Sequence, residues 1–316
     1  MRKTFVERLL TYAETDQRLH VVTGDLGYSV FEPFAARFED KFINAGIAEQ
    51  NMIGLSAGLA LSGKVVFAYS ITPFATARPF EQIRMDVGYH DLPVRIIGTG
   101  AGLSYGTLGP SHHGCEDLAL MRAIPNMIVT APADRFELGA IMDLSMKNPH
   151  PFYIRIGRSS EPDVHSAPPK LEIGKGIVVL DEGNDFAILA CGNMVAGAKE
   201  TAHLLAKKGI RGKVVSMPFV KPLDSEMVAR LGTSMPLFTC EEHSIIGGLG
   251  SAVAETLADE GIRPPAFGRI ALPDAFQKKV GKHAYLRQVN GLTPDDIAAK
   301  IERKIDGIGH RTTKKL

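Results

Sequence analysis

Short runs of β-branched and aromatic residues alternate with helical patterns through the first half of this chain. Helices are often followed or preceded by such a run, which favours a parallel sheet covered on both faces, since parallel neighbours need a crossover connection. Ligands of such sheets gather outside the carboxyl ends of the strands. Strands are predicted at 19–23, 42–45, 65–68, 94–98, 127–130 and 152–156, and helices at 3–15, 48–61, 75–87 and 135–146.

A change of composition follows this first α/β pattern. The segment 159–172, SSEPDVHSAPPKLE, holds three prolines and few apolar residues, which is typical of a linker. We predict a first domain at 1–160, a linker at 161–173 and a second domain at 174–316. Each domain is expected to be α/β, with a mainly parallel sheet flanked by helices. The second has strand patterns near 174–180, 186–190, 213–216, 237–241 and 267–270, and helical patterns near 194–208, 248–260 and 294–305.

The overall charge of the 316-residue chain gives no reason to expect a nucleic-acid or membrane partner. Lys and Arg number 36, Asp and Glu number 35, and the net charge is +1. The longest uncharged stretch, 96–115, is interrupted by glycines and a proline, and the charged N-terminus is unlike a signal peptide. Cys115, Cys191 and Cys240 have neither metal-ligand nor disulfide spacing, so we expect no metal site in this chain and a reducing cytoplasm around it.

One carboxylate, Glu49, stands where a predicted strand ends and an apolar, Gly-rich helix begins. The stretch 41–63 reads KFINAGIAEQNMIGLSAGLALSG. Glu49 lies in the first helical turn, where the helix dipole favours negative charge, and support of the helix start could be its whole role. Its neighbours Ile47 and Met52 are apolar, so we expect the carboxyl group to be half buried, which raises a carboxyl pKa. A protonated carboxyl group can donate a hydrogen bond to a ring nitrogen.

The same stretch closely resembles the pyrimidine-binding motif of transketolases and their relatives, the thiamine-diphosphate enzymes. The resemblance implies a pyrimidine-binding fold followed by a transketolase C-terminal fold. It implies that Glu49 is catalytic and hydrogen-bonds the aminopyrimidine ring of thiamine diphosphate, a contact that promotes loss of the thiazolium proton. Ile47, in the same motif, is expected to line the cofactor.

Two adjacent histidines, His112 and His113, follow a Gly-rich segment that begins after a predicted strand. Histidine near neutral pH can act as an acid or a base, or bind an anion. The segment 99–127 resembles the GxTH-plus-acid loop of transketolases and deoxyxylulose-phosphate synthases. On that match His112 faces the reacting carbons of the substrate–cofactor adduct, as a catalytic and substrate-binding residue. His113 is a second substrate-binding candidate, with a structural role as the alternative.

The segment 68–87 resembles the family segment whose aromatic side chains wall the aminopyrimidine. The match implies that the ring of Phe74 stacks on the cofactor and that Tyr69 flanks it, because stacking holds a flat heterocycle without fixing its protonation state. The earlier aromatic residue of the family segment is Ile71 here, so we expect a less aromatic wall.

Two arginines, Arg155 and Arg158, stand where the last predicted strand of the first domain meets the linker. A guanidinium group suits phosphate because it offers a planar, bidentate fork. Arg158 matches the position at which transketolases bind a sugar phosphate, and Arg155 is a weaker substrate-binding candidate. The chain departs from the family at Gly100, where transketolases carry a phosphate-contacting histidine, and at Leu108, where many carry an acid. Whether the substrate is phosphorylated therefore stays open.

The resemblance covers only the second and third domains of a full-length transketolase. No GDG followed by an Asn pair is present, the motif that binds the diphosphate through Mg²⁺. We therefore expect an N-terminal partner subunit to bind most of the Mg²⁺ and diphosphate, in a two-plus-two heterotetramer that acts on small sugars or aldehydes.

Three functions fit these motifs. The first is the C-terminal subunit of a two-chain transketolase, which moves a two-carbon ketol unit from a ketose to an aldehyde. The second is the beta subunit of a 2-oxoacid dehydrogenase first component, although the 109–127 run, GPSHHGCEDLALMRAIPNM, fits transketolases better. The third is a non-catalytic family remnant, against which the joint presence of Glu49, Phe74 and His112 argues. The sequence leaves the ketose, the aldehyde, the pathway and the identity of the partner chain open.

Overall fold

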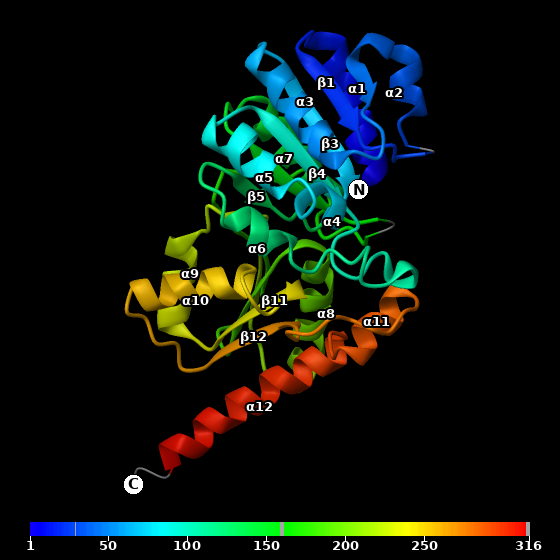
Figure 1. The fold of residues 1–316 in the computed structure, drawn as a ribbon. Coiled ribbons are helices and arrows are strands. Elements are labelled where there is room, and N and C mark those ends of the chain that lie inside the picture. The colour runs from blue at the N-terminus through cyan, green and yellow to red at the C-terminus, as the bar shows by residue number, and fades with distance from the viewer. Residues whose placement is uncertain (29, 159–160, 314–316) are drawn as a thin grey trace.

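The computed structural model describes residues 1–28, 30–158 and 161–313, and the side chains as far as residue 307. The first two residues of the proline-rich segment and the last three residues of the predicted second domain lie outside the described residues. Two open sheets form the framework of the molecule, and each is covered by helices on both faces (Figure 1). This arrangement confirms the predicted α/β fold class.

The first sheet has seven strands in the order β10-β5-β6-β4-β3-β1-β2. All its neighbouring strands are parallel except β10, which pairs antiparallel with β5 and comes from the second half of the chain. The two halves of the chain therefore share a sheet, which the sequence pattern did not predict. The strands are β1 (Leu19–Thr23), β2 (Phe42–Asn44), β3 (Val65–Ile71), β4 (Val94–Thr99), β5 (Ile128–Thr130), β6 (Phe152–Ile156) and β10 (Phe219–Lys221).

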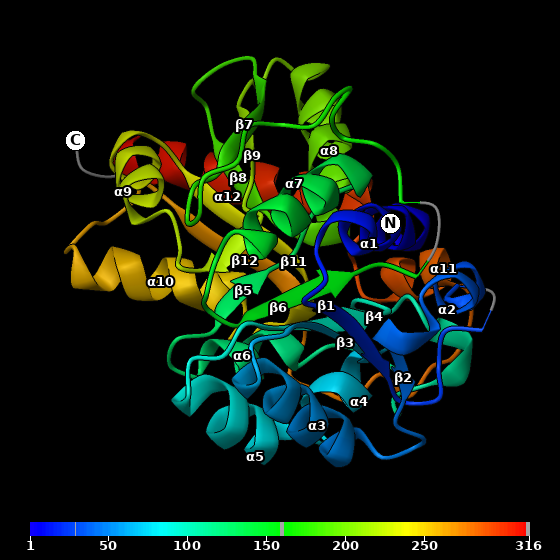
Figure 2. The ribbon, with the colours of Figure 1, turned by 90° about the horizontal axis from the view of Figure 1, so that it is seen from above.

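Helices cover both faces of this sheet (Figure 2). On one face α1 (Arg2–Thr15) packs beside α7 (Arg135–Met146), and on the other lies α3 (Glu49–Leu61). Strand residues alternate between two apolar clusters, so that Val21 and Phe67 contact the α1 side while Val22 and Ala68 contact the α3 side. Further helical segments are α2 (Glu32–Arg37), η1 (Glu39–Lys41), η3 (Gly106–Leu108) and α6 (Asp117–Arg122).

The helix predicted at 75–87 is instead broken into three segments, α4 (Thr72–Thr76), α5 (Phe80–Gln82) and the π-helical η2 (Ile83–Tyr89). The break falls at Pro79, which has no N–H to continue the helix and disfavours helical geometry at the residue before it. That preceding residue is Arg78, which the break presents at the surface beside the start of α3.

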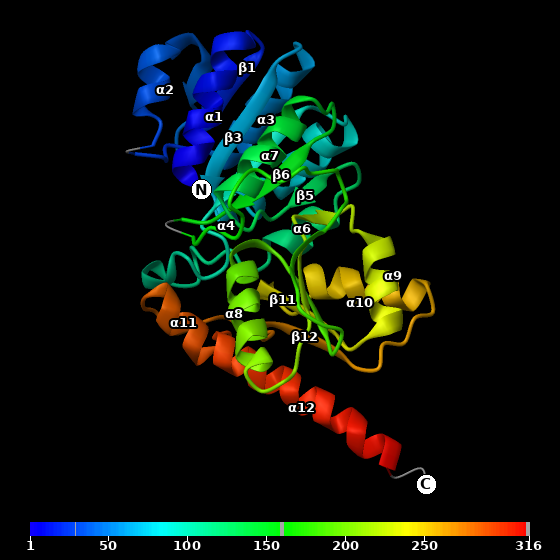
Figure 3. The same cartoon turned by 180° about the vertical axis from the view of Figure 1, so that it is seen from behind.

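The second sheet has five strands in the order β12-β11-β8-β9-β7, with only β7 antiparallel to its neighbour. Figure 3 shows α8 and α12 together on one side of it, and α9 and α10 together on the other. The strands are β7 (Ile177–Asp181), β8 (Ala187–Ala190), β9 (Lys213–Ser216), β11 (Leu237–Ser244) and β12 (Phe267–Leu272). The helices are η4 (Gly192–Met194), α8 (Val195–Ala206), α9 (Ser225–Ser234), α10 (Leu249–Asp259), α11 (His283–Val289) and α12 (Pro294–Thr313).

The last helix begins as its sequence indicates. Thr293 Oγ1 accepts a hydrogen bond from the backbone N–H of Asp296 at 3.3 Å, which is the contact of an N-cap residue. The helix then continues beyond the predicted end at 305, as far as Thr313. None of the helices in the described part of the chain has the length and hydropathy needed to span a bilayer.

Candidate functional site

Glu49 is the first residue of α3, at the carboxyl end of the neighbouring strands β1 and β2. The chain reverses between β2 and α3 through Gly46, whose φ of +74° is a left-handed conformation that favours glycine. The Glu49 side chain is 6% exposed, so the expected burial of this carboxylate is present in the structure. Ile47, in the same turn, is 78% exposed.

Glu49 makes a charged contact with Arg78, which the sequence analysis did not single out. Arg78 Nη1 donates a hydrogen bond to Glu49 Oε1 at 2.9 Å. The guanidinium carbon of Arg78 lies 3.8 Å from the centroid of the Phe74 ring, at cation–π distance. Carboxylate, guanidinium and aromatic ring therefore form one contiguous group at the sheet edge.

His112 completes this group through an aromatic contact with Phe74. The two ring centroids are 5.0 Å apart, in an edge-to-face arrangement. Burial lowers the pKa of His112, and the positive charge of Arg78 lowers it further. His112 is therefore mainly neutral at neutral pH, and it can accept a proton. Its Nδ1 lies 2.9 Å from Ser111 Oγ, and no described residue forms a hydrogen bond with its Nε2.

Tyr105 and Arg158 extend the site beyond His112. The Tyr105 ring centroid is 6.2 Å from that of His112, and the guanidinium carbon of Arg158 lies 4.7 Å from the Tyr105 ring. Burial raises the pKa of Tyr105, while the charges of Arg2 and Arg158 oppose the rise. A Cβ atom at Gly100, where φ is +91°, would lie 2.1 Å from the Tyr105 ring. The ring of Tyr105 thus occupies the space that a side chain at position 100 would need.

Tyr69 and His113, which the sequence also predicts as site residues, are both buried. Tyr69 is buried on the α1 side of the sheet, with its ring 5.7 Å from Phe5 and 4.9 Å from Phe31. This environment is part of the apolar core on the α1 side of the sheet, because strand residues alternate between the two faces.

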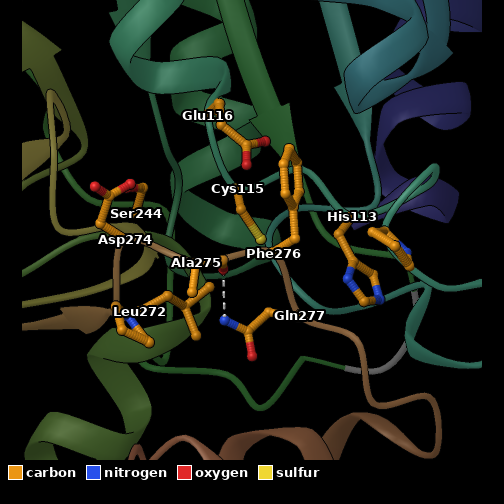
Figure 4. Close-up of a pocket in the computed structure, with 11 residues that line it drawn as sticks. His113, Cys115, Glu116, Ser244, Leu272, Asp274, Ala275, Phe276 and Gln277 are labelled. Carbon is orange, nitrogen blue, oxygen red and sulfur yellow. Dashed lines mark hydrogen bonds between the residues drawn. The ribbon is translucent and has the colours of Figure 1, made fainter.

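His113 is buried as well, and no described residue forms a hydrogen bond with either of its ring nitrogens. It lines a separate cavity of about 310 Å³ at the junction of the two sheets, where Figure 4 shows it and Asp274 on opposite sides. Cys115, Glu116 and Ser244 also line this cavity. The structure therefore separates His113 from its neighbour His112.

Arg155 occupies an interior position that differs from the substrate-facing one suggested by the sequence. Its Nε donates to Asp117 Oδ2 at 2.8 Å, and its Nη2 donates to Asp117 Oδ1 and to the carbonyl oxygens of Gly114 and Glu242. Both side chains of the Arg155–Asp117 pair are 1% exposed. Arg155 thus ties the histidine-bearing loop to the second sheet and has no surface from which to bind a substrate.

A second buried carboxylate, Glu242, anchors the Gly-rich segment 99–114 to the second sheet. It lies near the end of β11 and accepts hydrogen bonds from the backbone N–H of Leu103 at 2.7 Å, from His283 Nε2 and from Arg287 Nε. The sequence alone did not predict a role for Glu242, because the run EEH at 241–243, at the end of a strand, indicates no specific contact. The network fixes the segment that carries Tyr105 and His112.

The comparisons with known proteins define the class. A model of the transketolase pyrimidine-binding domain matches residues 1–162, and one of the transketolase C-terminal domain matches residues 174–297. The fold and these matches are those of a transketolase-type enzyme. The chain belongs to the transketolase family, and it is transketolase-like, of the ketol-transferring type.

Similar chains are themselves subunits or sections of transketolases. The chain is 40% identical to a putative transketolase C-terminal section of Methanocaldococcus jannaschii, over 95% of each chain. It is 37% identical to one subunit of the apulose-4-phosphate transketolase of Phocaeicola vulgatus, over 86% of this chain and 87% of that one. It is 38% identical to SqwH, a 6-deoxy-6-sulfo-D-fructose transketolase subunit of a Clostridium species, over 94% and 92%.

Solved structures agree on the fold. A split-gene transketolase, described as an inactive beta4 tetramer, matches with a TM-score of 0.87 and 39% identity, over 96% of this chain and 98% of that one. A transketolase of Pichia stipitis matches with a TM-score of 0.82 over 98% of this chain but 46% of its own length. At 20% identity this second match supports the fold alone. Both family models are transketolase models, which favours ketol transfer over the 2-oxoacid dehydrogenase alternative.

Proposed function

We propose that this chain supplies the pyrimidine-binding half of a thiamine-diphosphate site in a two-chain transketolase. The observation that supports it best is the contiguous group of Glu49, Arg78, Phe74 and His112 at the carboxyl edge of the first sheet. The family depends on thiamine diphosphate, which supplies the carbon nucleophile that takes up a two-carbon ketol unit.

The pyrimidine end of the cofactor fits the residues present. No described residue forms a hydrogen bond with Glu49 Oε2, so this oxygen can exchange a proton with a ring nitrogen. The half-buried ring of Phe74 offers an apolar surface to a flat heterocycle. We retain exposed Ile47 as a lining residue. Tyr69 is left out because its ring is enclosed in the core.

His112 is the proposed acid or base on the substrate side. It is mainly neutral at neutral pH, and no described residue forms a hydrogen bond with its Nε2. His112 can therefore accept a proton from a substrate hydroxyl group and return it. His113 has no comparable route to the site, so its proposed role is to support the loop at the neighbouring cavity.

The substrate end of the site is assigned to Arg158, with Tyr105 beneath it and Arg2 nearby. Arg158 is partly exposed and can bind an anionic group through two N–H donors. Tyr105 replaces the histidine that the family resemblance implies at position 100. An acceptor or donor with an anionic end, a phosphate or another acid group, fits these residues.

Replacing Arg158 with methionine should raise the KM for an anionic substrate by about 10-fold or more while leaving stability unchanged, because a charged hydrogen bond contributes about 1.5–3 kcal/mol. Steady-state kinetics at several substrate concentrations, with urea unfolding alongside, would measure both. Arg155→Met is the matched comparison, and it should mainly lower stability. A normal KM in Arg158→Met would remove Arg158 from the substrate site.

The diphosphate end is proposed to lie on an N-terminal partner subunit. Mg²⁺ is assigned mainly to that partner, because this chain lacks the GDG and Asn-pair motif through which the family binds the diphosphate. The similar proteins named as subunits support a partner, and we propose a heterotetramer of two chains of each kind.

The cysteines Cys115, Cys191 and Cys240 are free and buried, which supports a reducing, cytoplasmic setting. The domain limits 1–160, 161–173 and 174–316 remain a prediction.

Mixing the chain with its N-terminal partner tests the proposal. With thiamine diphosphate, Mg²⁺, a ketose and an aldehyde, the mixture should transfer a ketol unit that neither chain transfers alone. Calorimetry should show weak cofactor binding to this chain by itself. Tight binding by the chain alone would contradict the shared site, and acylation of a lipoyl domain from a 2-oxoacid would favour the dehydrogenase alternative.

A further inference from the structure

Arg78 contacts both groups that the proposed function assigns to the pyrimidine ring. It donates to Glu49 Oε1 at 2.9 Å, and its guanidinium carbon lies 3.8 Å from the Phe74 ring centroid. It lies between α4 and α5, in the turn where Pro79 interrupts the helix. Neither contact is explained by the packing of α4.

The Arg78–Glu49 pair differs from an ordinary surface ion pair. Exposed pairs contribute about 0–1 kcal/mol, because solvent screens them and both side chains lose freedom. Here the acceptor is 6% exposed, and the planar guanidinium is also held against a ring. Arg84 and Glu81, a few residues along, are 49% and 60% exposed and form an ion pair with each other. They provide a pair of the same residue types without the buried carboxylate.

We propose that Arg78 is a positioning residue of the cofactor site, which fixes Glu49 through Oε1 so that Oε2 faces the cofactor ring, and which places a positive charge beside His112. This inference rests on the proposed function. One guanidinium group would then orient the carboxylate, support the Phe74 ring and act on the histidine. Substitution of Arg78 should therefore alter both Glu49 and His112.

The groups around His112 allow the effect of this charge to be isolated. Ser111, Tyr105 and His113 belong to the same loop, Arg158 lies behind Tyr105, and Arg78 approaches from the α4–α5 junction. Burial is the main cause of the lowered His112 pKa, and the Arg78 charge adds to it. Removing that charge should raise the His112 pKa, whereas a lysine in its place should keep the pKa low.

The first test is an NMR titration of His112 in the isolated chain, with His112→Gln used to assign its signal. Arg78→Met should raise the midpoint of the titration, Arg78→Lys should restore most of the original value, and Arg84→Met should leave it unchanged. An unchanged midpoint in Arg78→Met would overturn the electrostatic part of the proposal. Because Arg78 is 49% exposed, these variants should fold normally, and urea unfolding would verify that they do.

The second test measures the Kd of thiamine diphosphate with Mg²⁺ for the complex of this chain with its partner subunit. Arg78→Met should raise the Kd about 10-fold, Arg78→Lys should raise it less, and Arg84→Met should not change it. Tighter binding to Arg78→Met would mean that Arg78 obstructs the ring, and would overturn the proposal. The Kd of Glu49→Gln separates a failure of the Arg78 proposal from a failure of the proposed function. An unchanged Kd in both Arg78→Met and Glu49→Gln would contradict the proposed function. A raised Kd in Glu49→Gln but not in Arg78→Met would reject only the role of Arg78.

Discussion

Glu49→Gln is expected to lower the kcat of ketol transfer about a thousandfold in the complex with the partner subunit, because an amide cannot exchange a proton with a ring nitrogen. The glutamine is close in shape to the native side chain, and its oxygen can still accept the hydrogen bond that Arg78 donates at 2.9 Å. The loss should therefore arise in the chemical step and not in folding. Steady-state kinetics at saturating cofactor would measure it.

Glu81→Gln serves as the control for this result. Glu81 also pairs with an arginine, but it is 60% exposed and lies outside the proposed site, so its replacement should leave kcat unchanged. Urea unfolding should give Glu49→Gln a stability close to that of the native chain. Full activity in Glu49→Gln would refute the proton-exchange role of Glu49, and with it both enzyme hypotheses drawn from the sequence.

Much of the architecture could be predicted because it depends on local pattern. The strands at 19–23 and 152–156 match the structure, since short runs rich in β-branched and aromatic residues are typical of the largely buried strands of a parallel sheet. The long-range pairing of β10 (Phe219–Lys221) with β5 could not be predicted, because three residues carry no periodicity that specifies a partner. The prediction of one continuous helix at 75–87 was wrong, because Pro79 interrupts the helix.

The site was predictable only where a motif covers it. Glu49, Phe74 and His112 lie together, although their assigned roles remain predictions. Arg78 was not predicted as a site residue. The available signal was that it precedes a proline, because the residue before a proline is biased away from helical geometry. Tyr105 was missed because its contact with Gly100 exists only in the folded turn.

The two arginines near the linker show a different limit of sequence reasoning. Arg155 and Arg158 are three residues apart, and both are suited to anions. What separates them is Asp117, on a distant helix, which pairs with Arg155 in the interior and leaves Arg158 near the surface. Burial and partner choice of this kind depend on tertiary contacts, which a single sequence does not display.

Glu242→Gln is expected to lower the free energy of unfolding by about 3 kcal/mol, because it removes the negative charge of a fully buried carboxylate and leaves its partly buried partners Arg287 and His283 without compensation. Glu242 is fully buried, and it receives hydrogen bonds from Leu103, His283 and Arg287. Urea unfolding monitored by circular dichroism would measure the change. Glu226→Gln is the control, since Glu226 pairs with Lys175 at the surface of the same half of the molecule, where ion pairs contribute about 0–1 kcal/mol.

The pH dependence of this difference tests its electrostatic origin. Burial alone would raise the pKa of Glu242, but the charges of Arg287 and His283 and the Leu103 N–H outweigh it, so the pKa lies well below its usual range. A carboxylate with a lowered pKa stabilises the folded state above its unfolded pKa of about 4.3, and loses that contribution as the pH falls toward the folded pKa. Glu242→Gln has no such contribution to lose, so the gap between it and the native chain should shrink below about pH 4. A gap that stays constant on acidification would show that shape and hydrogen bonding, and not charge, make Glu242 the anchor of the histidine-bearing loop.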